Sequence, residues 1–227
     1  MNYKTFFRGK KIAVVGLGPH GEMMADVRFL LRIGADITLY DMRSEVRLQG
    51  FVPALEKAGL LNHSFGKINP DDLSKFELII LSPEISRKAS FLKKAQTANV
   101  QIDYTDMLFL KMSPAITLIG VMGAYGKSTI AHMLYGMLKR SFSEYEDQGL
   151  YYIDPDLPNG ALTHLKKIKT GDVVLARITE ERMDEYHSAR ISPHVAVITS
   201  PVSFSILEHQ TYNNFIIAPD IVIDAIR

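Results

Sequence analysis

A lysine and a serine follow two closely spaced glycines at residues 123–129, in a pattern that can bind phosphate. Backbone N–H groups between Gly123 and Gly126 can surround a phosphate, and Lys127 can reach the β- and γ-oxygens of a nucleotide. The Ser128 hydroxyl can ligate Mg²⁺. Val121 stands where the common Walker sequence has its first glycine, so this is a shorter Gly-x-x-Gly-Lys-Ser form. The predicted ATP-binding loop comprises Gly123, Ala124, Tyr125, Gly126, Lys127, Ser128 and Thr129.

A second glycine pattern, Gly16-Leu17-Gly18-Pro19-His20-Gly21, follows an apolar run near the N-terminus. In a strand–turn–helix unit the first glycine permits the turn, the second lets a phosphate approach the backbone, and the third lets helix and strand pack. Asp41 ends the next predicted strand and can accept hydrogen bonds from a ribose or a base. Pro19 removes one N–H donor from the turn. Three interpretations stay open: an NAD site, a uridine nucleotide site, and a turn that binds nothing.

The elements that position these motifs alternate between short β-branched runs and helical patterns. Nearly continuous apolar strands separated by helices predict parallel sheets covered on both faces. A helix break at Ser113-Pro114 divides this α/β chain into a Rossmann-like domain, 1–112, and an incomplete P-loop-type central domain, 113–227. The predicted strands are Lys11–Gly16, Asp36–Asp41, Glu77–Ser82, Val100–Tyr104, Ala115–Val121, Leu150–Ile153, Asp172–Ile178 and Val195–Thr199. The predicted helices are Gly21–Ile33, Pro53–Ala58, Arg87–Ala98, Lys127–Arg140, Asn159–Lys169, Glu180–Ser188 and Val202–Ile217.

The composition argues against several functional classes. Apolar residues make up 47% and charged residues 22% of the chain, as in ordinary globular proteins. The formal net charge of +1 gives no electrostatic basis for binding nucleic acid or an acidic membrane surface. The absence of cysteine removes disulfides, thiolate metal sites and thiol nucleophiles. The sequence shows no signal peptide and no apolar stretch of membrane-spanning length, so we expect a cytoplasmic protein.

Together these motifs resemble the Mur ligases, and among them the enzymes that add D-glutamate. The resemblance rests on both glycine patterns, on Asp41-Met42-Arg43 and on Ile80-Leu81-Ser82-Pro83. It implies an ATP-dependent amide ligase, in which a carboxylate becomes an acyl phosphate that an amino acid's amine attacks. It also implies that Lys127 and Ser128 bind ATP and Mg²⁺, and that the first domain binds the UDP of UDP-N-acetylmuramoyl-L-alanine. The implied UDP-binding residues are Gly16, Leu17, Gly18, Asp41, Arg43 and Ser82.

The second half of the chain departs from this family at the metal-binding positions. Ala176 stands where the family has a Mg²⁺-binding glutamate, and Phe204 where it has an aspartate. Pro219 replaces the lysine whose carbamate bridges two Mg²⁺ ions. His209 keeps its family position and is, with Lys127, the candidate catalytic residue that the resemblance implies. Because hard cations need several oxygen ligands, these replacements put the Mg²⁺ chemistry of this chain in question.

Glu180 and Glu181 are two carboxylates that could be offered as replacement metal ligands. Their position directly after Thr179, a potential N-cap residue, has a simpler explanation. Acidic residues in the first turn of a helix are stabilised by the helix dipole, whatever the helix does. The structural role is therefore the better interpretation of this pair.

Three functions follow from these observations. The first is an ATP-dependent ligase of the D-glutamate-adding type, present here without the family's third domain and several central strands. The second is a degenerate relative that binds nucleotide or UDP-sugar as a regulatory or partner protein. The third is an NAD-dependent oxidoreductase built on the first glycine pattern. A central sheet that ends early would expose an edge strand, which favours a homodimer or a contact with another chain.

Overall fold

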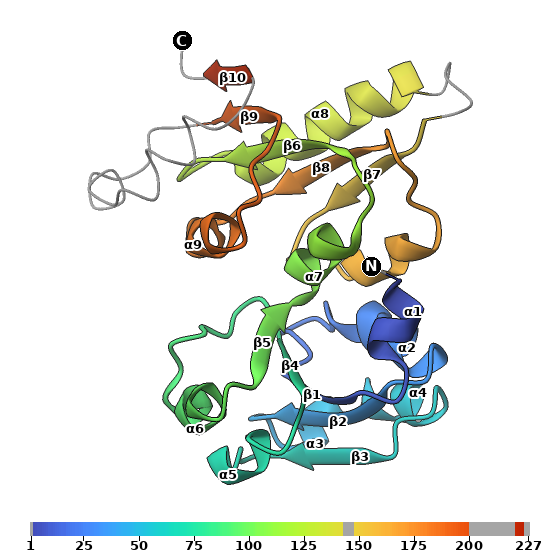
Figure 1. Cartoon of the computed structure of the whole chain (residues 1–227), viewed down its shortest axis with the longest axis vertical. Helices are drawn as coiled ribbons and strands as arrows, with labels where there is room; N and C mark the ends of the chain where they lie inside the picture. Colours follow the sequence, from blue (N-terminus) through green and yellow to red (C-terminus); the bar gives the residue numbers. More distant parts are fainter. Residues whose placement is uncertain (1, 143–147, 200–220, 225–227) are drawn as a thin grey trace. The chain divides into compact units, whose positions relative to one another are not determined.

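Parallel strands form two five-stranded sheets, one in each of two units of the chain (Figure 1). The computed structural model describes residues 2–142, 148–199 and 221–224. Unit 1 comprises Met1–Met112 together with Pro155–Leu165, and unit 2 comprises Ser113–Asp154 together with Lys166–Arg227. The two units are therefore not separated by a single point in the sequence, because residues 155–165 pack with unit 1.

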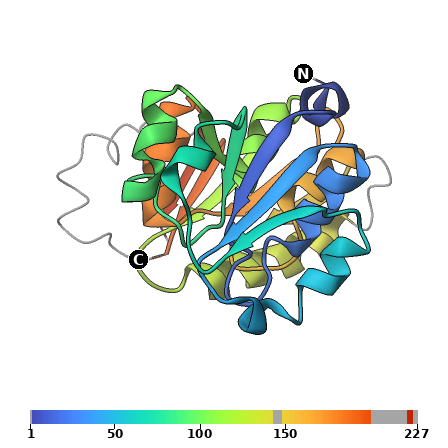
Figure 2. The same cartoon turned by 90° about the horizontal axis from the view of Figure 1, so that it is seen from below.

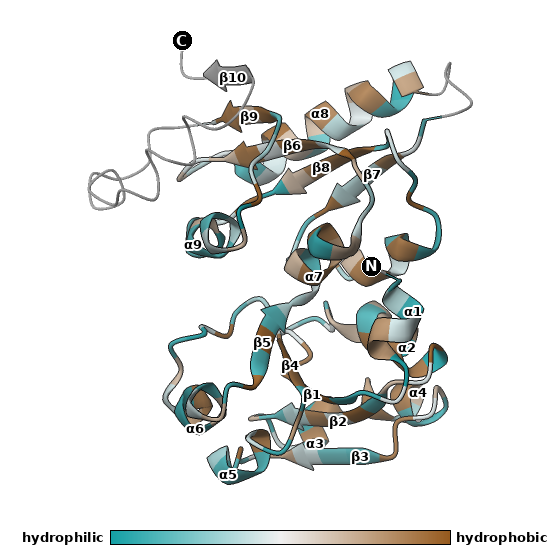
Figure 3. Cartoon of the chain, in the orientation of Figure 1, coloured by the Kyte–Doolittle hydropathy of each residue, from teal (hydrophilic) through white to brown (hydrophobic). Residues whose placement is uncertain are grey.

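The sheet of unit 1 has the strand order β3-β2-β1-β4-β5, and its strands run side by side in Figure 2. β1 and β4 are hydrophobic (Figure 3) and buried except for Lys11, as expected of strands covered on both faces. The edge strand β3 was not predicted, because its sequence is mostly polar and its residues are partly exposed. The strands are β1 (Lys11–Val15), β2 (Asp36–Asp41), β3 (Asn62–Phe65), β4 (Leu78–Leu81) and β5 (Gln101–Tyr104).

Short helices connect the strands of unit 1. α2 begins at Met24 and not at Gly21, because Gly21 has a φ of +82° and belongs to the turn after β1. The helix predicted over residues 87–98 is a 3-10 turn followed by the five-residue α6. The helices are α1 (Tyr3–Phe7), α2 (Met24–Arg32), α3 (Glu45–Leu48), α4 (Val52–Glu56), α5 (Pro70–Leu73), η1 (Ser90–Leu92), α6 (Lys93–Thr97) and α7 (Thr105–Met112).

Residues 155–165 pack into unit 1 around a buried carboxyl group. The Leu162 N–H donates a hydrogen bond of 2.8 Å to Asp26 Oδ1, and Asp26 is only 2% exposed. A Cβ at Gly160 would lie 2.6 Å from the Cβ of Ala25, so this close approach requires glycine. Burial outweighs the hydrogen bonds to the carboxyl group and raises the pKa of Asp26 to about 7. The segment therefore covers a carboxyl group that the fold holds in its neutral form below neutral pH.

The sheet of unit 2 is also parallel, with the order β10-β9-β6-β8-β7. The α/β class with parallel sheets is thus confirmed in both units. The predicted helix over residues 159–169 is the shorter 3-10 helix η2 (Ala161–Lys166), and the one predicted over 202–217 lies outside the described residues. β10 was not predicted. The remaining elements are β6 (Thr117–Met122), α8 (Lys127–Phe142), β7 (Leu150–Ile153), β8 (Val173–Arg177), α9 (Glu180–Ser188), β9 (Val195–Ile198) and β10 (Ile221–Asp224).

Within the described ranges, the longest helix is α8, and none of the helices there is long and apolar enough to cross a membrane. α8 follows the predicted phosphate loop and packs on β6, β7 and β8. The loop therefore lies between the central strand of the sheet and a helix that is anchored on three strands.

Candidate functional site

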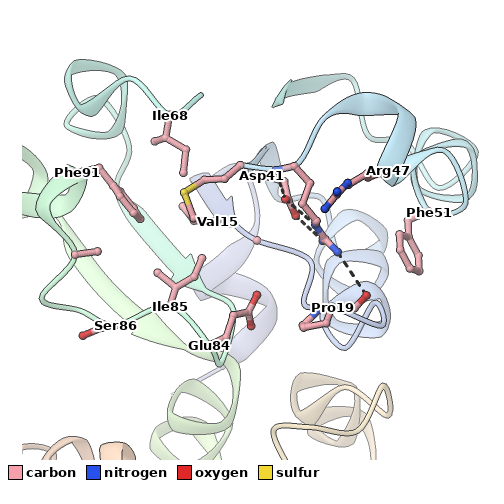
Figure 4. A pocket seen from close by; sticks show the side chains of 14 residues that line it. Val15, Pro19, Asp41, Arg47, Phe51, Ile68, Glu84, Ile85, Ser86 and Phe91 are labelled. Carbon is pink, nitrogen blue, oxygen red and sulfur yellow. Dashed lines mark hydrogen bonds and ion pairs between the residues drawn. The ribbon is translucent and has the colours of Figure 1, made fainter. Parts of the chain in front are cut away.

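A pocket in unit 1 opens at the carboxyl ends of its central strands. The chain passes from β1 to β2 on one side and later returns to β4 on the other, so the strand order reverses between β1 and β4. Ligands of open α/β sheets bind at such a reversal. The pocket has a volume of about 660 Å³ (Figure 4). Its lining residues are Val15, Gly16, Pro19, Asp41, Met42, Arg43, Arg47, Phe51, Ile68, Glu84, Ile85, Ser86, Ala89 and Phe91.

Asp41 and Arg43 form the polar centre of this pocket. Arg43 donates to the Asp41 carboxylate from Nε at 2.9 Å and from Nη2 at 2.7 Å, and its backbone N–H donates at 2.9 Å. The Leu17 N–H, in the glycine turn, donates to Asp41 Oδ2 at 3.1 Å. Burial raises the pKa of Asp41, but the hydrogen bonds from Arg43 and Leu17 outweigh it and hold the pKa below its ordinary value. Asp41 is thus an ionised acceptor at the end of β2.

The structure places the remaining predicted UDP-binding residues at the same edge of the sheet. Gly16 and Gly18 have φ angles of +81° and +80°, which glycine adopts without strain. A Cβ at Gly16 would lie 2.9 Å from the Cβ of Ser82, so the turn after β1 touches the end of β4. Ser82 is fully buried, and its hydroxyl donates to the Glu84 carboxylate. The predicted residues are therefore brought together, but the Ser82 hydroxyl is directed to a neighbouring side chain.

Two carboxylates in this region were missed from the sequence. Glu22 accepts a hydrogen bond of 3.0 Å from the His20 N–H and is 8% exposed, and Glu84 lines the pocket. Their charges act on Arg43: its pKa is raised chiefly by the hydrogen bond to Asp41 and further by the charges of Asp41, Glu84 and Glu22. The available signal was their position, directly after Gly21 and two residues after Ser82.

The predicted phosphate loop connects β6 with α8 in unit 2. Lys127 Nζ donates to the carbonyl oxygens of Gly123 at 2.5 Å and Ala124 at 3.1 Å, so the ammonium lies across the loop. Thr199, which follows β9, donates its hydroxyl proton to the carbonyl oxygens of Met122, at 3.2 Å, and of Tyr125, at 2.5 Å. The strand order of this sheet also reverses at β6. The loop therefore lies at the edge where open α/β sheets generally bind ligands, and the Lys127 ammonium is directed into it.

Gly120 does not belong to this loop. It lies within β6, and a Cβ there would meet Ile178 Cδ1 at 2.8 Å and Pro193 Cβ at 3.2 Å. Its role is close packing in the sheet. The short form of the motif, which begins at Gly123, thus lies between the end of β6 and the N-terminus of α8, and its binding of phosphate stays a prediction.

The described residues do not provide a ligand set for Mg²⁺. In these ranges, no group of three or more His, Cys, Asp or Glu side chains is placed to hold a metal ion. Ser128 contributes a single hydroxyl in the first turn of α8, and Ala176, buried in β8, has no side-chain oxygen. Glu180 and Glu181 occupy the first turn of α9 as expected of dipole-stabilised residues. The positions of Phe204, His209 and Pro219 lie outside the described residues.

A buried ion pair occupies the carboxyl ends of β8 and β7. Arg177 Nε donates to Asp154 Oδ1 at 2.7 Å, and the side chains are 5% and 3% exposed. The Tyr152 hydroxyl donates to the other oxygen of Asp154 at 2.8 Å. Arg177 pairs in register with Val121 of β6, just before the phosphate loop. A cation thus follows directly after Ala176, the position where the resemblance implies a metal-binding carboxylate.

Residues 10–103 match the family described as Mur ligase MurD-like, N-terminal domain. The UDP-N-acetylmuramoylalanine–D-glutamate ligase of Roseiflexus sp. (strain RS-1) is 29% identical over 213 residues, which are 93% of this chain and 44% of that protein. The protein of the same name from Acetivibrio thermocellus is 25% identical over 219 residues, which are 96% of this chain and 44% of that protein. The chain therefore spans less than half the length of these relatives.

Two solved structures share the fold at low sequence identity. The UDP-N-acetylmuramate–alanine ligase MurC of Thermotoga maritima is 18% identical with a TM-score of 0.55, over 95% of this chain and 49% of that one. The UDP-N-acetylmuramate:L-alanyl-gamma-D-glutamyl-meso-diaminopimelate ligase of Neisseria meningitides is 13% identical with a TM-score of 0.57, over 96% of this chain and 72% of that one. These two likenesses show the shared fold. The family match over β1 to β5 confirms the resemblance for that part of the chain: residues 10–103 are a MurD-like N-terminal domain of the Mur ligase family.

Proposed function

We propose that this chain is the nucleotide-binding part of a MurD-like protein. Unit 1 recognises the uridine nucleotide of a UDP-N-acetylmuramoyl compound, and unit 2 binds the phosphates of ATP. The observation that carries the proposal is the ionised Asp41, held at the strand-order reversal by Arg43 and by the Leu17 N–H. The carboxylate now accepts four N–H groups, three from Arg43 and one from Leu17, so a nucleoside donor binds it by replacing one of the Arg43 donors.

The apolar walls of the unit 1 pocket support the same ligand. Ile68, Ile85 and Phe91 line it opposite the polar residues (Figure 4), and apolar walls with few polar groups are typical of small-molecule sites. A base can lie against such a wall while Asp41 accepts its hydrogen bonds. Gly16, Leu17, Gly18, Arg43 and Ser82 then serve to shape and hold this end of the pocket.

In unit 2, the loop from Gly123 to Gly126 fits a phosphate group. The ammonium of Lys127 lies 2.5–3.1 Å from the loop's carbonyl oxygens, so a modest side-chain rotation turns it toward a bound anion. Ala124, Tyr125, Ser128 and Thr129 complete the loop and the first turn of α8. ATP, when bound, supplies the phosphoryl group by which the family's ligases activate a carboxylate. Among the described residues, no cluster of three or more carboxylate or histidine side chains is placed to hold Mg²⁺ beside these phosphates.

A second function, nucleotide binding without ligation, is favoured by one observation. The position of the family's metal-binding glutamate is the buried Ala176, and the next residue is an arginine in a buried ion pair. Two Mg²⁺ ions beside phosphates need carboxylate oxygens. This chain then serves as a regulatory or partner protein in the cytoplasm. β7 and β10 are the outer strands of the unit 2 sheet, and a second copy or another chain can pair with such an edge.

Calorimetric titrations of the chain with UDP-N-acetylmuramoyl-L-alanine, uridine, NAD and ATP test the proposal. Asp41→Asn should weaken the binding of uridine and of the UDP compound by about tenfold or more, because it removes a charged acceptor. Asp36→Asn, at the exposed other end of β2, is the matched control. Binding of NAD without uridine would overturn the uridine assignment in favour of an oxidoreductase. ATP-dependent phosphate release with D-glutamate separates ligation from binding alone.

A further inference from the structure

The Glu22 side chain fills the space that the second glycine of the unit 1 turn leaves open. In a phosphate-binding turn this glycine lets the phosphate approach the backbone. Here a Cβ at Gly18 would lie 2.0 Å from Glu22 Oε2 and 2.9 Å from Glu22 Cδ. Glu22 is 8% exposed, so its carboxylate is packed against the turn and does not extend into solvent. The ligand position at Gly18 is thus occupied by a negatively charged group of the chain itself.

Three N–H groups of the same turn donate hydrogen bonds to carboxylate or carbonyl oxygens within unit 1. The Leu17 N–H donates to Asp41 Oδ2 at 3.1 Å, and the His20 N–H donates to Glu22 Oε2 at 3.0 Å. The Gly21 N–H donates to the Gly18 carbonyl at 3.3 Å, and Pro19 has no N–H. A phosphate at this turn would have to displace Glu22 before it could accept a hydrogen bond from His20. The N–H groups of Leu17, His20 and Gly21 are therefore already engaged within the chain.

The charges nearby also disfavour a second anion. The Arg43 guanidinium donates to Asp41 from two of its nitrogens and to the Pro19 carbonyl from the third, at 3.5 Å, so all three are engaged within the chain. Its pKa is raised first by this hydrogen bond to Asp41 and further by the charges of Glu84 and Glu22, so both glutamates act on the same guanidinium. A diphosphate placed at the turn would add its negative charges to these three carboxylates, and like charges in a partly buried site repel.

We propose that Glu22 is a built-in anion that occupies the phosphate position of the Gly16–Gly21 turn, so that the pocket selects the nucleoside part of its ligand and not the diphosphate. This inference deepens the proposed uridine site and, for its ligand, rests on it. Glu22 performs the role that a ligand phosphate performs elsewhere: it accepts the His20 N–H and lies against the Gly18 backbone. A nucleotide gains its diphosphate contacts here only when Glu22 leaves the turn.

Calorimetric titrations of the full chain with uridine and with UDP test this selection. All proteins carry Lys127→Ala, which removes phosphate binding at the unit 2 loop. With Glu22 present, UDP should bind no more than about threefold tighter than uridine, whereas Glu22→Ala should raise the preference for UDP by about tenfold or more. Glu22→Gln removes the charge but keeps the size of the side chain, so its preference for UDP over uridine should lie between those of the protein with Glu22 and Glu22→Ala. Glu56→Gln, at an exposed position of α4 outside the pocket lining, is the control for charge. A tenfold UDP preference that Glu22→Ala leaves unchanged would overturn the inference.

Pyrophosphate tests Glu22 without any nucleoside, so it decides the inference even where uridine fails to bind. The probe is the amide resonance of His20 and Leu17 in labelled full chain, again with Lys127→Ala. Pyrophosphate should shift these resonances saturably in Glu22→Ala, with an affinity about tenfold or more above that in the protein with Glu22. Equal affinities, or no saturable shift in either protein, would refute the role of Glu22. Absence of uridine binding with a positive pyrophosphate result would overturn only the proposed uridine site.

Discussion

The glycine turns of the two units occupy equivalent places in their sheets but have opposite chemistry. Each follows a central strand, β1 or β6, at the point where the strand order reverses. In unit 1 the turn's N–H groups donate to the carboxylates of Asp41 and Glu22. In unit 2 the loop's carbonyl oxygens accept hydrogen bonds from the Lys127 ammonium and the Thr199 hydroxyl. One turn is engaged by anions of its own chain, and the other by a cation and a neutral hydroxyl.

This difference shows that glycine spacing defines a backbone shape and not a ligand. Gly16, Gly18 and Gly126 have nearly equal positive φ angles of +81°, +80° and +79°. What can bind there depends on side chains that the glycine pattern does not include, such as Glu22 and Lys127. In unit 1, the residue directly after the third glycine decides the charge at the turn.

The largest expected effect concerns the ion pair of each unit. Arg177→Met leaves Asp154 charged in a site where both side chains are 5% exposed or less, and should destabilise unit 2 by about 3–5 kcal/mol. Arg43→Met should cost unit 1 only about 1–2 kcal/mol, because Arg43 is 26% exposed and Asp41 keeps the Leu17 N–H. Urea unfolding followed by residue-resolved hydrogen exchange measures each unit. The double substitution Arg177→Met and Asp154→Leu should recover most of the loss; equal costs in the two units would contradict this assignment.

The next largest effect is a pH dependence of the stability of unit 1, caused by the buried Asp26. The pKa of Asp26 is raised to about 7 in the folded chain, so the fold favours its neutral form. Its contribution to stability is complete below the unfolded pKa near 4 and is lost as pH rises through about 7, with a slope of about 1.4 kcal/mol per pH unit. Asp26→Asn should remove this slope, which amounts to roughly 4 kcal/mol over the whole interval.

The measurement for Asp26 is the free energy of unfolding at several pH values between 4 and 8 for both proteins. The difference between them isolates this one group from other carboxylates such as Asp41, whose lowered pKa has the opposite effect. Asp36→Asn, at the exposed start of β2, is the control. Parallel pH profiles of Asp26→Asn and the unsubstituted chain would show that burial of Asp26 is relieved in solution.

The affinity for ATP should depend on the cation of the unit 2 loop, the Lys127 ammonium. Lys127→Ala removes the ammonium from the unit 2 loop and should weaken ATP binding by about 10- to 100-fold, the range of a charged hydrogen bond. Lys139→Ala, in the last turn of the same helix, should leave it unchanged. A thermal shift with ATP in excess measures the effect, since a ligand at 100 times its Kd stabilises a fold by about 2.7 kcal/mol. An undiminished shift in Lys127→Ala would place the ATP elsewhere.

The smallest effect is a coupling between Gly18 and Glu22. Gly18→Ala places a Cβ 2.0 Å from Glu22 Oε2 and also strains a φ of +80°. Glu22→Ala removes the clash but not the strain, so the double substitution should be less costly than the sum of the single ones. We expect a coupling of about 1 kcal/mol from a double-mutant cycle of urea unfolding. Additivity within about 0.3 kcal/mol would mean that Glu22 does not lie against Gly18.

The periodicity of the sequence was sufficient for the fold class because buried parallel strands have long apolar runs. β1, β4, β6 and β8 were all predicted, and each is buried over most of its length. β3 was missed because an edge strand with one open side needs little apolar character. The start of α2 was predicted three residues too early, at Gly21 instead of Met24, because glycine spacing does not reveal where a turn ends.

The site was predictable only where its residues belong to a motif. Asp41 was found from its place at a strand end, and it is indeed the ionised centre of the pocket. Glu84 follows β4 and Arg47 lies in α3, after β2, and no spacing rule connects them with the turn. The pair of Arg177 and Asp154 joins residues 23 positions apart through the pairing of β7 and β8. Such long-range contacts depend on strand order, which the sequence alone did not provide.

The return of residues 155–165 to unit 1 has a consequence for how this architecture can be recombined. A chimera that exchanges residues 1–112 between two relatives would combine the Asp26 of one protein with the Leu162 N–H and the Gly160 turn of the other. The two segments must therefore be inherited together, although 42 residues of unit 2, Ser113–Asp154, lie between them in the sequence. Exchange of both segments at once preserves the contact, so the part of the chain that can be exchanged as one piece of structure is discontinuous in sequence.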